Sequence, residues 1–274
     1  MDLRERPQQF FARHPWETAR AAFFCRVVRD ASAAGTPLRV LDVGAGDGFV
    51  ARALLRQLPA GSKVECYDAH YTDEMLRTLE AESPALKFHR QPPEKTFDLI
   101  MMLDVLEHVP DDVQFLSHFA STLLAANGKV LISVPAYMGL FTQHDIAIGH
   151  YRRYDAPGMR DLIADAGLQP IISGTLFHSL LLPRLLTKVS EVARGVHSIP
   201  APEQLGAQVE TDLGRWRAGQ LTTRLVDAAL AVDTRVSRLA AALRIRPPGL
   251  SKWALASLAP ESSAHRSRKR SDAR

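Results

Sequence analysis

The segment at residues 39–55, RVLDVGAGDGFVARALL, constrains the fold of this chain more than any other. A run of apolar residues ends at Gly44, Gly46 and Gly48, and the chain then becomes amphipathic. Glycine is required where φ is positive or where a ligand approaches the backbone. A strand, a glycine-rich turn and a helix place the turn at the carboxyl edge of a sheet, where doubly wound folds bind ligands. The segment therefore predicts such a ligand-binding unit, and a tight turn that merely needs glycines is the alternative.

Apolar segments alternate with amphipathic segments around this unit. Strands are predicted at residues 38–43, 63–68, 97–103 and 129–134, and each is apolar on both faces, as buried parallel strands are. Helices are predicted between them and over residues 15–33. The alternation indicates right-handed βαβ units in one doubly wound sheet.

Capping residues set the expected limits of two later helices. Asp111 or Asp112 suits the start of one helix, and Asn127-Gly128 suits its end. Asp155 suits the start of a second helix, and Gly167 suits its end. A strand is predicted directly after this second helix.

The C-terminal part has a different pattern. Residues 176–246 are helical in pattern, and residues 251–258 read as a final strand that returns to the sheet. One long stripe of apolar residues has helical spacing: Leu221, Leu225, Ala228, Val232, Val236, Leu239 and Leu243. We expect a main domain formed by residues 1–175 and 249–260, a helical insertion at residues 176–248, and a basic, disordered tail at residues 261–274.

Charge and cysteine usage limit the class of protein. The formal net charge is +4, and the last 13 residues alone hold five Arg or Lys and one Asp. In the rest of the chain the positive and negative charges balance, which argues against a nucleic-acid partner. Cys25 and Cys66 have no metal-like spacing, no signal peptide is evident, and the longest uncharged apolar run, residues 171–183, is 13 residues long. We expect a soluble, cytoplasmic protein.

Two residues near the glycines indicate the kind of ligand. Phe49 stands where a dinucleotide fingerprint has its last small residue, which argues against a pyrophosphate. Asp68 lies 20 residues after Gly48 at the end of the next strand, where a carboxylate accepts hydrogen bonds from a ribose diol. The pattern favours a nucleoside without a pyrophosphate.

Four segments in succession, VLDVGAGDG, YDAH, FDLIMMLDVLEHVPDD and LAANGKVLISVP, resemble the motifs of class I S-adenosylmethionine (SAM) methyltransferases. The resemblance covers roughly residues 38–258. It implies an α/β fold with a doubly wound, mostly parallel seven-strand sheet, an antiparallel last strand and a helical insertion before it. It also implies that SAM is the cofactor and that it is held by Asp42, Gly44, Gly46, Gly48, Asp68, Ala69, Gln91, Asp104 and Val105. Gln91 would replace an Asp that many relatives have after the third strand.

The segment HDIAIGHYRRYD, residues 144–155, is similar to a pattern in a subgroup near the ubiquinone-pathway and aryl-polyene-type O-methyltransferases. His144 and His150 are candidates for a general base that accepts the proton of an acceptor hydroxyl. Arg152 and Arg153 suit an acceptor carboxylate or phosphate. An internal hydrogen-bond network is the alternative for the whole segment. The acceptor-binding candidates are Trp16, Tyr137, Arg152, Arg153 and Tyr154.

Other residues and the insertion leave alternatives open. Glu107 and His108 either reach the cleft or brace the turn after the strand, and Trp16 either touches substrate or anchors the first helix. His144, Asp145 and His150 are residue types that bind divalent ions, but no third ligand at a suitable spacing is evident, so no metal is expected. The insertion covers the acceptor pocket, forms a homodimer interface, or dips into a membrane; membrane contact is not expected.

These observations predict a SAM-dependent methyltransferase that acts on a small organic acceptor. O-methylation of a phenolic or carboxylate-bearing intermediate of specialised metabolism suits the histidines and arginines. Methylation of a prenyl or lipid-linked acceptor at oxygen or carbon is the alternative. A methyltransferase-like scaffold that binds SAM without transferring its methyl group is the alternative outside enzymology.

Overall fold

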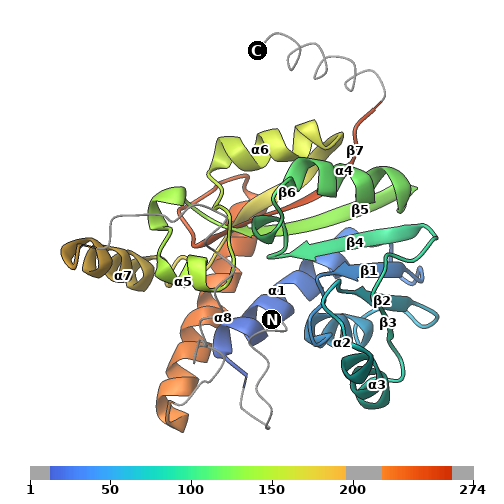
Figure 1. The fold of residues 1–274 in the computed structure, drawn as a ribbon, viewed down its shortest axis with the longest axis horizontal. Helices are drawn as coiled ribbons and strands as arrows, with labels where there is room; N and C mark the ends of the chain where they lie inside the picture. Colours follow the sequence, from blue (N-terminus) through green and yellow to red (C-terminus); the bar gives the residue numbers. More distant parts are fainter. Residues whose placement is uncertain (1–12, 196–217, 261–274) are drawn as a thin grey trace.

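A computed structural model describes residues 13–195 and 218–260 of the chain (Figure 1). Seven strands form one sheet in the order β3-β2-β1-β4-β5-β7-β6. The strands are β1 (Arg39–Val43), β2 (Lys63–Tyr67), β3 (Lys87–His89), β4 (Phe97–Leu103), β5 (Leu124–Pro135), β6 (Leu168–Leu176) and β7 (Ser251–Leu258). The helices are α1 (Pro15–Ala31), α2 (Phe49–Leu55), α3 (Asp73–Glu82), α4 (Asp112–Thr122), α5 (Gln143–Ala147), α6 (Ala156–Asp165), α7 (Leu181–Ala193) and α8 (Gln220–Ala242), with short 3-10 turns at Leu106–His108 and Met138–Leu140.

The predicted sheet is confirmed. β1 to β5 pair in parallel, while β7 lies between β5 and β6 and is antiparallel to both. The last strand of the chain, β7, is thus inserted between β5 and β6, which both precede it in the sequence. The parallel pairing places the carboxyl ends of β1, β2, β4 and β5 along one edge of the sheet, where the turns after these strands can form a common site.

Two apolar layers hold the helices against the sheet. On one face, Phe23 and Phe24 of α1 pack with Leu54 of α2 and Leu79 of α3. On the other face, the layer is formed by side chains of α4 and α6, which include Phe119, Met159 and Leu162. The strands other than β3 contribute to both layers, which is why their sequences are apolar on both faces.

One predicted helix end is wrong. The helix that begins after Asp111 ends at Thr122, and β5 begins at Leu124 and runs through Asn127-Gly128. Asp111 does cap the helix by accepting from the amide of Gln114 at 2.9 Å. Pairing of Leu124 with Phe97 of β4 outweighs the local stop signal, because a ladder partner satisfies the backbone there.

The helices of the predicted insertion differ in how they meet the rest of the molecule. α8 packs against α1 and β6, whereas α7 reaches past the edge of the sheet and lies near the turn at Met138–Leu140 (Figure 1). Within residues 13–195 and 218–260, no helix is both long enough and apolar enough to cross a bilayer. The expected tail at residues 261–274 lies outside the described residues.

Candidate functional site

The glycine-rich turn between β1 and α2 needs glycine for its conformation. Gly44, Gly46 and Gly48 have φ values of 66°, 56° and 72°, which side-chain-bearing residues rarely adopt. A Cβ added to Gly44 would also lie 2.6 Å from Cγ2 of Val105, which follows β4. The turn therefore packs closely against the end of a neighbouring strand, and Val105, a predicted cofactor residue, lies directly against it.

Two aspartates lie beside this turn. Asp68, at the end of β2, is almost buried and accepts hydrogen bonds from the amides of Gly46 at 3.2 Å and His70 at 2.9 Å. Burial raises the pKa of Asp42, inside β1, to about 7, and the Asp68 carboxylate adds to this effect. The lone pairs left on Asp68 match the hydroxyl donors of a ribose, so these residues fit the nucleoside part of SAM.

Asp104 stands at the end of β4 in a conformation rare for a residue other than glycine, with φ of 58°. One of its oxygens accepts from the hydroxyl of Ser133 at 2.6 Å, and the other accepts from the guanidinium of Arg20. Burial by itself would raise the pKa of Asp104, but the Arg20 charge and the Ser133 hydrogen bond hold it below its ordinary value. The carboxylate is thus charged and fixed at the sheet edge.

The start of α1 covers the glycine-rich turn. Arg13 forms an ion pair with Asp47 and lies over the ring of Phe49, 3.9 Å from its centroid. Together with Glu17 and Arg20 these residues enclose a cavity of about 10 Å³. No local sequence pattern indicates Arg13, because its partners Asp47 and Phe49 follow β1 and are distant in the sequence.

The other residues predicted near the cofactor have less defined places. Trp16 packs edge-on against Phe177 at 6.4 Å and lies beneath the guanidinium of Arg20, which fits an anchor for α1. Ala69 and Gln91 are exposed after β2 and β3. Their predicted contacts with SAM or substrate stay predictions.

His150 is held by a buried carboxylate. Its Nδ1 lies 2.9 Å from Oδ1 of Asp145, which is fully buried. Arg153 donates to the same carboxylate at 2.7 Å and 2.9 Å, and Arg184 of α7 donates to its other oxygen. Burial opposes ionisation, but these donors hold the pKa of Asp145 well below its ordinary value. A charged Asp145 fixes the proton of His150 on Nδ1 and leaves Nε2 as an acceptor.

His144, the other candidate base, is in a different state. It lies on the short helix α5, and its Nδ1 is buried without a hydrogen-bond partner within residues 13–195 and 218–260. Burial together with the nearby Arg184 lowers the pKa of His144 to about 4. It is neutral at pH 7. A histidine with so low a pKa and without an orienting carboxylate is a poor proton acceptor.

Four of the five predicted acceptor-binding residues, all except Trp16, lie together, and three of these four are held by internal partners. Tyr137, Arg152, Arg153 and Tyr154 line one open cleft of about 600 Å³ between α4, α6 and the end of β5. Arg152 pairs with Asp112 at 2.9 Å, and the hydroxyl of Tyr154 donates to the same carboxylate at 2.7 Å. Arg153 is bound to Asp145. These contacts support the internal-network alternative for most of the segment.

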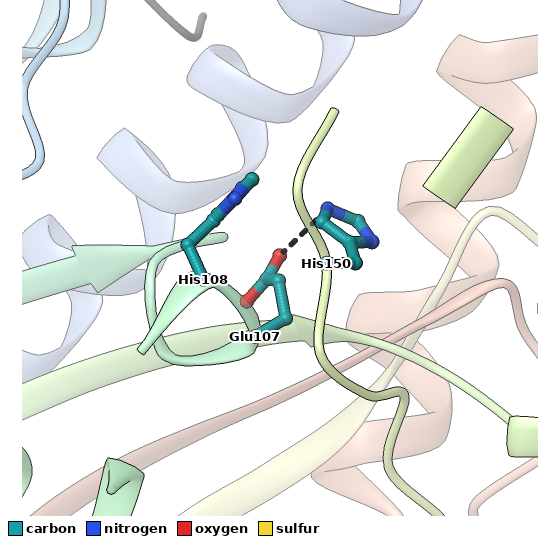
Figure 2. Close-up of side chains that lie close together, drawn as sticks. All are labelled: Glu107, His108 and His150. Atoms are coloured by element: carbon teal, nitrogen blue, oxygen red, sulfur yellow. Dashed lines mark ion pairs between the residues drawn. The ribbon is translucent and has the colours of Figure 1, made fainter. Parts of the chain in front are cut away.

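Glu107, His108 and His150 form a compact cluster (Figure 2). Glu107 is fully buried, and neither carboxylate oxygen has a hydrogen-bond partner among the residues that the structure describes. Oε1 lies 3.9 Å from Nε2 of His150, and the His108 and His150 ring centroids are 4.6 Å apart. Burial and the neighbouring Asp104 raise the pKa of Glu107 well above its ordinary value. The free nitrogen of His150 therefore faces a carboxyl group at the edge where β4 and β5 end.

The cluster of Glu107, His108 and His150 is also suited to bind a cation. One ligand atom from each of the three residues lies within 4.8 Å of the others, and a carboxylate with two imidazoles is a common donor set for divalent transition metals. It differs from the His144, Asp145 and His150 set considered from the sequence. Glu107 either remains a neutral carboxyl group or becomes a carboxylate beside a cation.

Comparison with known proteins agrees with this architecture. The family described as "Methyltransferase domain" matches residues 16–172, more than half of the chain. The ubiquinone biosynthesis O-methyltransferase of Paramagnetospirillum magneticum is 31% identical over 93 residues, which cover 31% of this chain and 36% of that enzyme. The match thus spans about a third of the relative's length.

Solved structures share the fold at low sequence identity. A provisionally assigned sarcosine dimethylglycine methyltransferase from Galdieria sulphuraria aligns with 16% identity and a TM-score of 0.50, over 88% of this chain and 85% of that one. Coclaurine N-methyltransferase aligns with 11% identity and a TM-score of 0.52, over 88% and 71%. The [4+2]-cyclase SpnF aligns with 14% identity and a TM-score of 0.51, over 88% and 82%. Since a cyclase has the same fold, the reaction must be argued from the site.

Proposed function

This chain belongs to the methyltransferase domain family, whose cofactor is SAM, and on that premise we propose that it methylates an oxygen atom of a small organic acceptor. A phenolic or carboxylate-bearing biosynthetic intermediate suits the proposal. The observation that carries it is the Asp145–His150 pair, whose free imidazole nitrogen lies at the edge of the sheet near Asp104. Methylation of an oxygen requires loss of its proton, and this pair supplies an acceptor for it.

The turn after β1 and the acids around it would hold the cofactor. Gly44, Gly46 and Gly48 leave the backbone bare, Asp68 would accept from the ribose hydroxyls, and Asp104 would lie beside the methionine part. When bound, SAM supplies an electrophilic methyl group. Arg20, which neutralises Asp104, would position that carboxylate from α1.

His150 would act as the general base. Asp145 keeps its Nδ1 protonated, so Nε2 accepts the proton of the acceptor hydroxyl while the new oxygen–carbon bond forms. Most of the catalytic effect would come from holding the acceptor in line and keeping water out.

The first experiment is transfer of labelled methyl from SAM into an extract of the producing cells, followed by separation of lipid and non-lipid products. Label in a small non-lipid product supports the proposal. Label in the lipid fraction supports the prenyl or lipid-linked acceptor instead. SAM binding without transfer to any fraction supports the scaffold.

Variants of the candidate base test the mechanism. His150→Gln is expected to lower kcat about 10²–10⁴-fold with little change in SAM affinity, because only proton removal is lost. His118→Gln, an exposed histidine on α4, is the matched control and should keep full activity. If His150→Gln retains its kcat at every pH while His144→Gln loses activity, His144 is the base and the assignment is wrong.

A further inference from the structure

Helix α8 is oriented with its apolar side toward solvent. Leu221, Leu225, Val232, Val236, Leu239 and Leu243 are each between 46% and 73% exposed. At 100° per residue these six fall within an arc of about 60°, a stripe about 33 Å long. The buried residues of the helix are Leu230, Asp233, Thr234, Ser237 and Ala241. A surface helix ordinarily has the opposite orientation.

The buried side of α8 forms specific hydrogen bonds with the segment that follows β6. Asp233 accepts from the amide of Ser179 at 2.7 Å, from its hydroxyl at 2.6 Å, and from the amide of His178 at 3.1 Å. The hydroxyl of Ser237 lies 3.1 Å from Nε2 of His178. Rotating the helix to bury its leucines would break all of these contacts, so the outward stripe is a consequence of specific packing.

Helix α7 repeats this arrangement. Its polar side contacts the body: Arg184 binds Asp145, Lys188 donates to the carbonyl of Phe141 at 2.7 Å, and Glu191 accepts from the amide of Gln143 at 3.1 Å. Its aliphatic side faces outward, with each residue between 44% and 62% exposed: Leu182, Leu185, Leu186, Val189 and Val192. Two helices of one predicted insertion thus expose eleven aliphatic side chains, far more than a monomer usually leaves bare.

The charges beside these stripes favour one kind of partner. Within residues 181–195 and 218–246, the exposed charged side chains are Arg194, Arg224, Arg235, Arg244, Arg246 and one acid, Asp227. A second copy of the chain would bring like charges together across an interface. The large apolar side chains of the exposed stripes are all leucine or valine, whereas protein interfaces are enriched in aromatic residues and methionine. Aliphatic side chains flanked by arginines match the surface of an anionic bilayer.

We propose that α7 and α8 form a docking surface for an anionic lipid bilayer, with their leucines and valines in the acyl boundary and the arginines at the headgroups. Neither helix crosses a bilayer, so both lie in its surface. The surface is linked to the site, because Arg184 of α7 binds the carboxylate that holds His150. This inference stands on the two stripes and does not depend on the identity of the acceptor.

Cosedimentation of the full chain with lipid vesicles tests the proposal. Vesicles of phosphatidylcholine with about a third phosphatidylglycerol should bind the wild-type chain, and pure phosphatidylcholine vesicles should bind it less. The variant with Leu225→Gln, Val232→Thr, Val236→Thr and Leu239→Gln should bind the anionic vesicles about tenfold or more weakly. These positions are exposed, so the variant should unfold at the temperature of the wild type.

Ile171→Thr is the matched control, because it removes an exposed aliphatic side chain outside both helices. It should bind vesicles like the wild type. Sedimentation velocity without lipid gives the second readout. If the wild type does not bind anionic vesicles, or if it dimerises through a contact that the four-residue variant abolishes, the bilayer is not the partner and the proposal is overturned.

Discussion

Replacing Glu107 by glutamine is expected to stabilise the protein by an amount that grows with pH. The side chain is fully buried, and neither oxygen has a hydrogen-bond partner in the described part of the chain. Burial and the nearby Asp104 raise the pKa of Glu107 well above 4.5. In the unfolded chain a glutamate ionises near pH 4.3. Between these two pKa values the folded state binds one more proton than the unfolded state, so wild-type stability falls as pH rises through this window.

The size of the effect follows from proton linkage. The free energy of unfolding of the wild type should fall by about 1.4 kcal/mol for each pH unit in the window, whereas glutamine does not titrate. The advantage of Glu107→Gln should therefore grow by about 1.4 kcal/mol for each pH unit above the unfolded pKa, until the pH reaches the folded pKa. That change corresponds to several degrees in the melting temperature.

Urea denaturation of both proteins at about pH 5, 6 and 7 measures this quantity. Glu94→Gln, an exposed glutamate in the loop before β4, is the control and should show no such trend. A difference between wild type and Glu107→Gln that is the same at every pH would refute the reasoning, since it would mean that Glu107 is charged in the fold. If a chelator then restores the pH dependence, a cation at Glu107, His108 and His150 is the cause.

Two further predictions concern groups held at the same edge. Asp145→Asn should cost about 3–5 kcal/mol in urea denaturation, because it leaves the buried Arg153 and the neighbouring Arg184 without their anion. Since the pKa of Asp145 is lowered in the fold, its contribution is present above about pH 4 and is lost as pH falls toward the folded value, so wild type and variant should converge in acid. Gly44→Ala should destabilise by about 1–2 kcal/mol from its positive φ alone, and by more from the Val105 contact. Adding Val105→Ala to Gly44→Ala should remove the steric contact but not the cost of the positive φ. Thermal unfolding of the double variant Gly44→Ala/Val105→Ala should therefore show only part of the stability restored.

The sheet could be predicted because its signals are local. Except for β3, whose three residues include a single apolar side chain, each strand carries its own run of apolar residues, and the helices between the strands carry their own stripes and caps, as Asp111 and Asp155 do. The glycine spacing could be predicted for the same reason. The end of α4 could not, because the pairing of Leu124 with Phe97 across the sheet decided it.

The candidate site was only partly accessible from the sequence. The segment at residues 144–155 drew attention through its density of polar residues, yet nothing in it distinguishes His144 from His150. The distinction arises from Asp145, which accepts from Arg153 and Arg184 and turns toward the Nδ1 atom of His150. Glu107 joins His150 across 43 positions of the chain, and only the turn after β4 brings them together.

The sequence by itself therefore determined the order of strands and helices, the glycine turn and the acids at the strand ends, because these follow from short-range periodicity and backbone sterics. The tertiary structure decided which side chains face one another and which side of each helix faces out. From the sequence, the apolar stripe from Leu221 to Leu243 is typical of a helix face that packs on a core. The hydrogen bonds of Asp233 with residues 178 and 179 instead orient α8 so that this stripe faces solvent. Long-range polar contacts fix helix orientation, and no local pattern contains them.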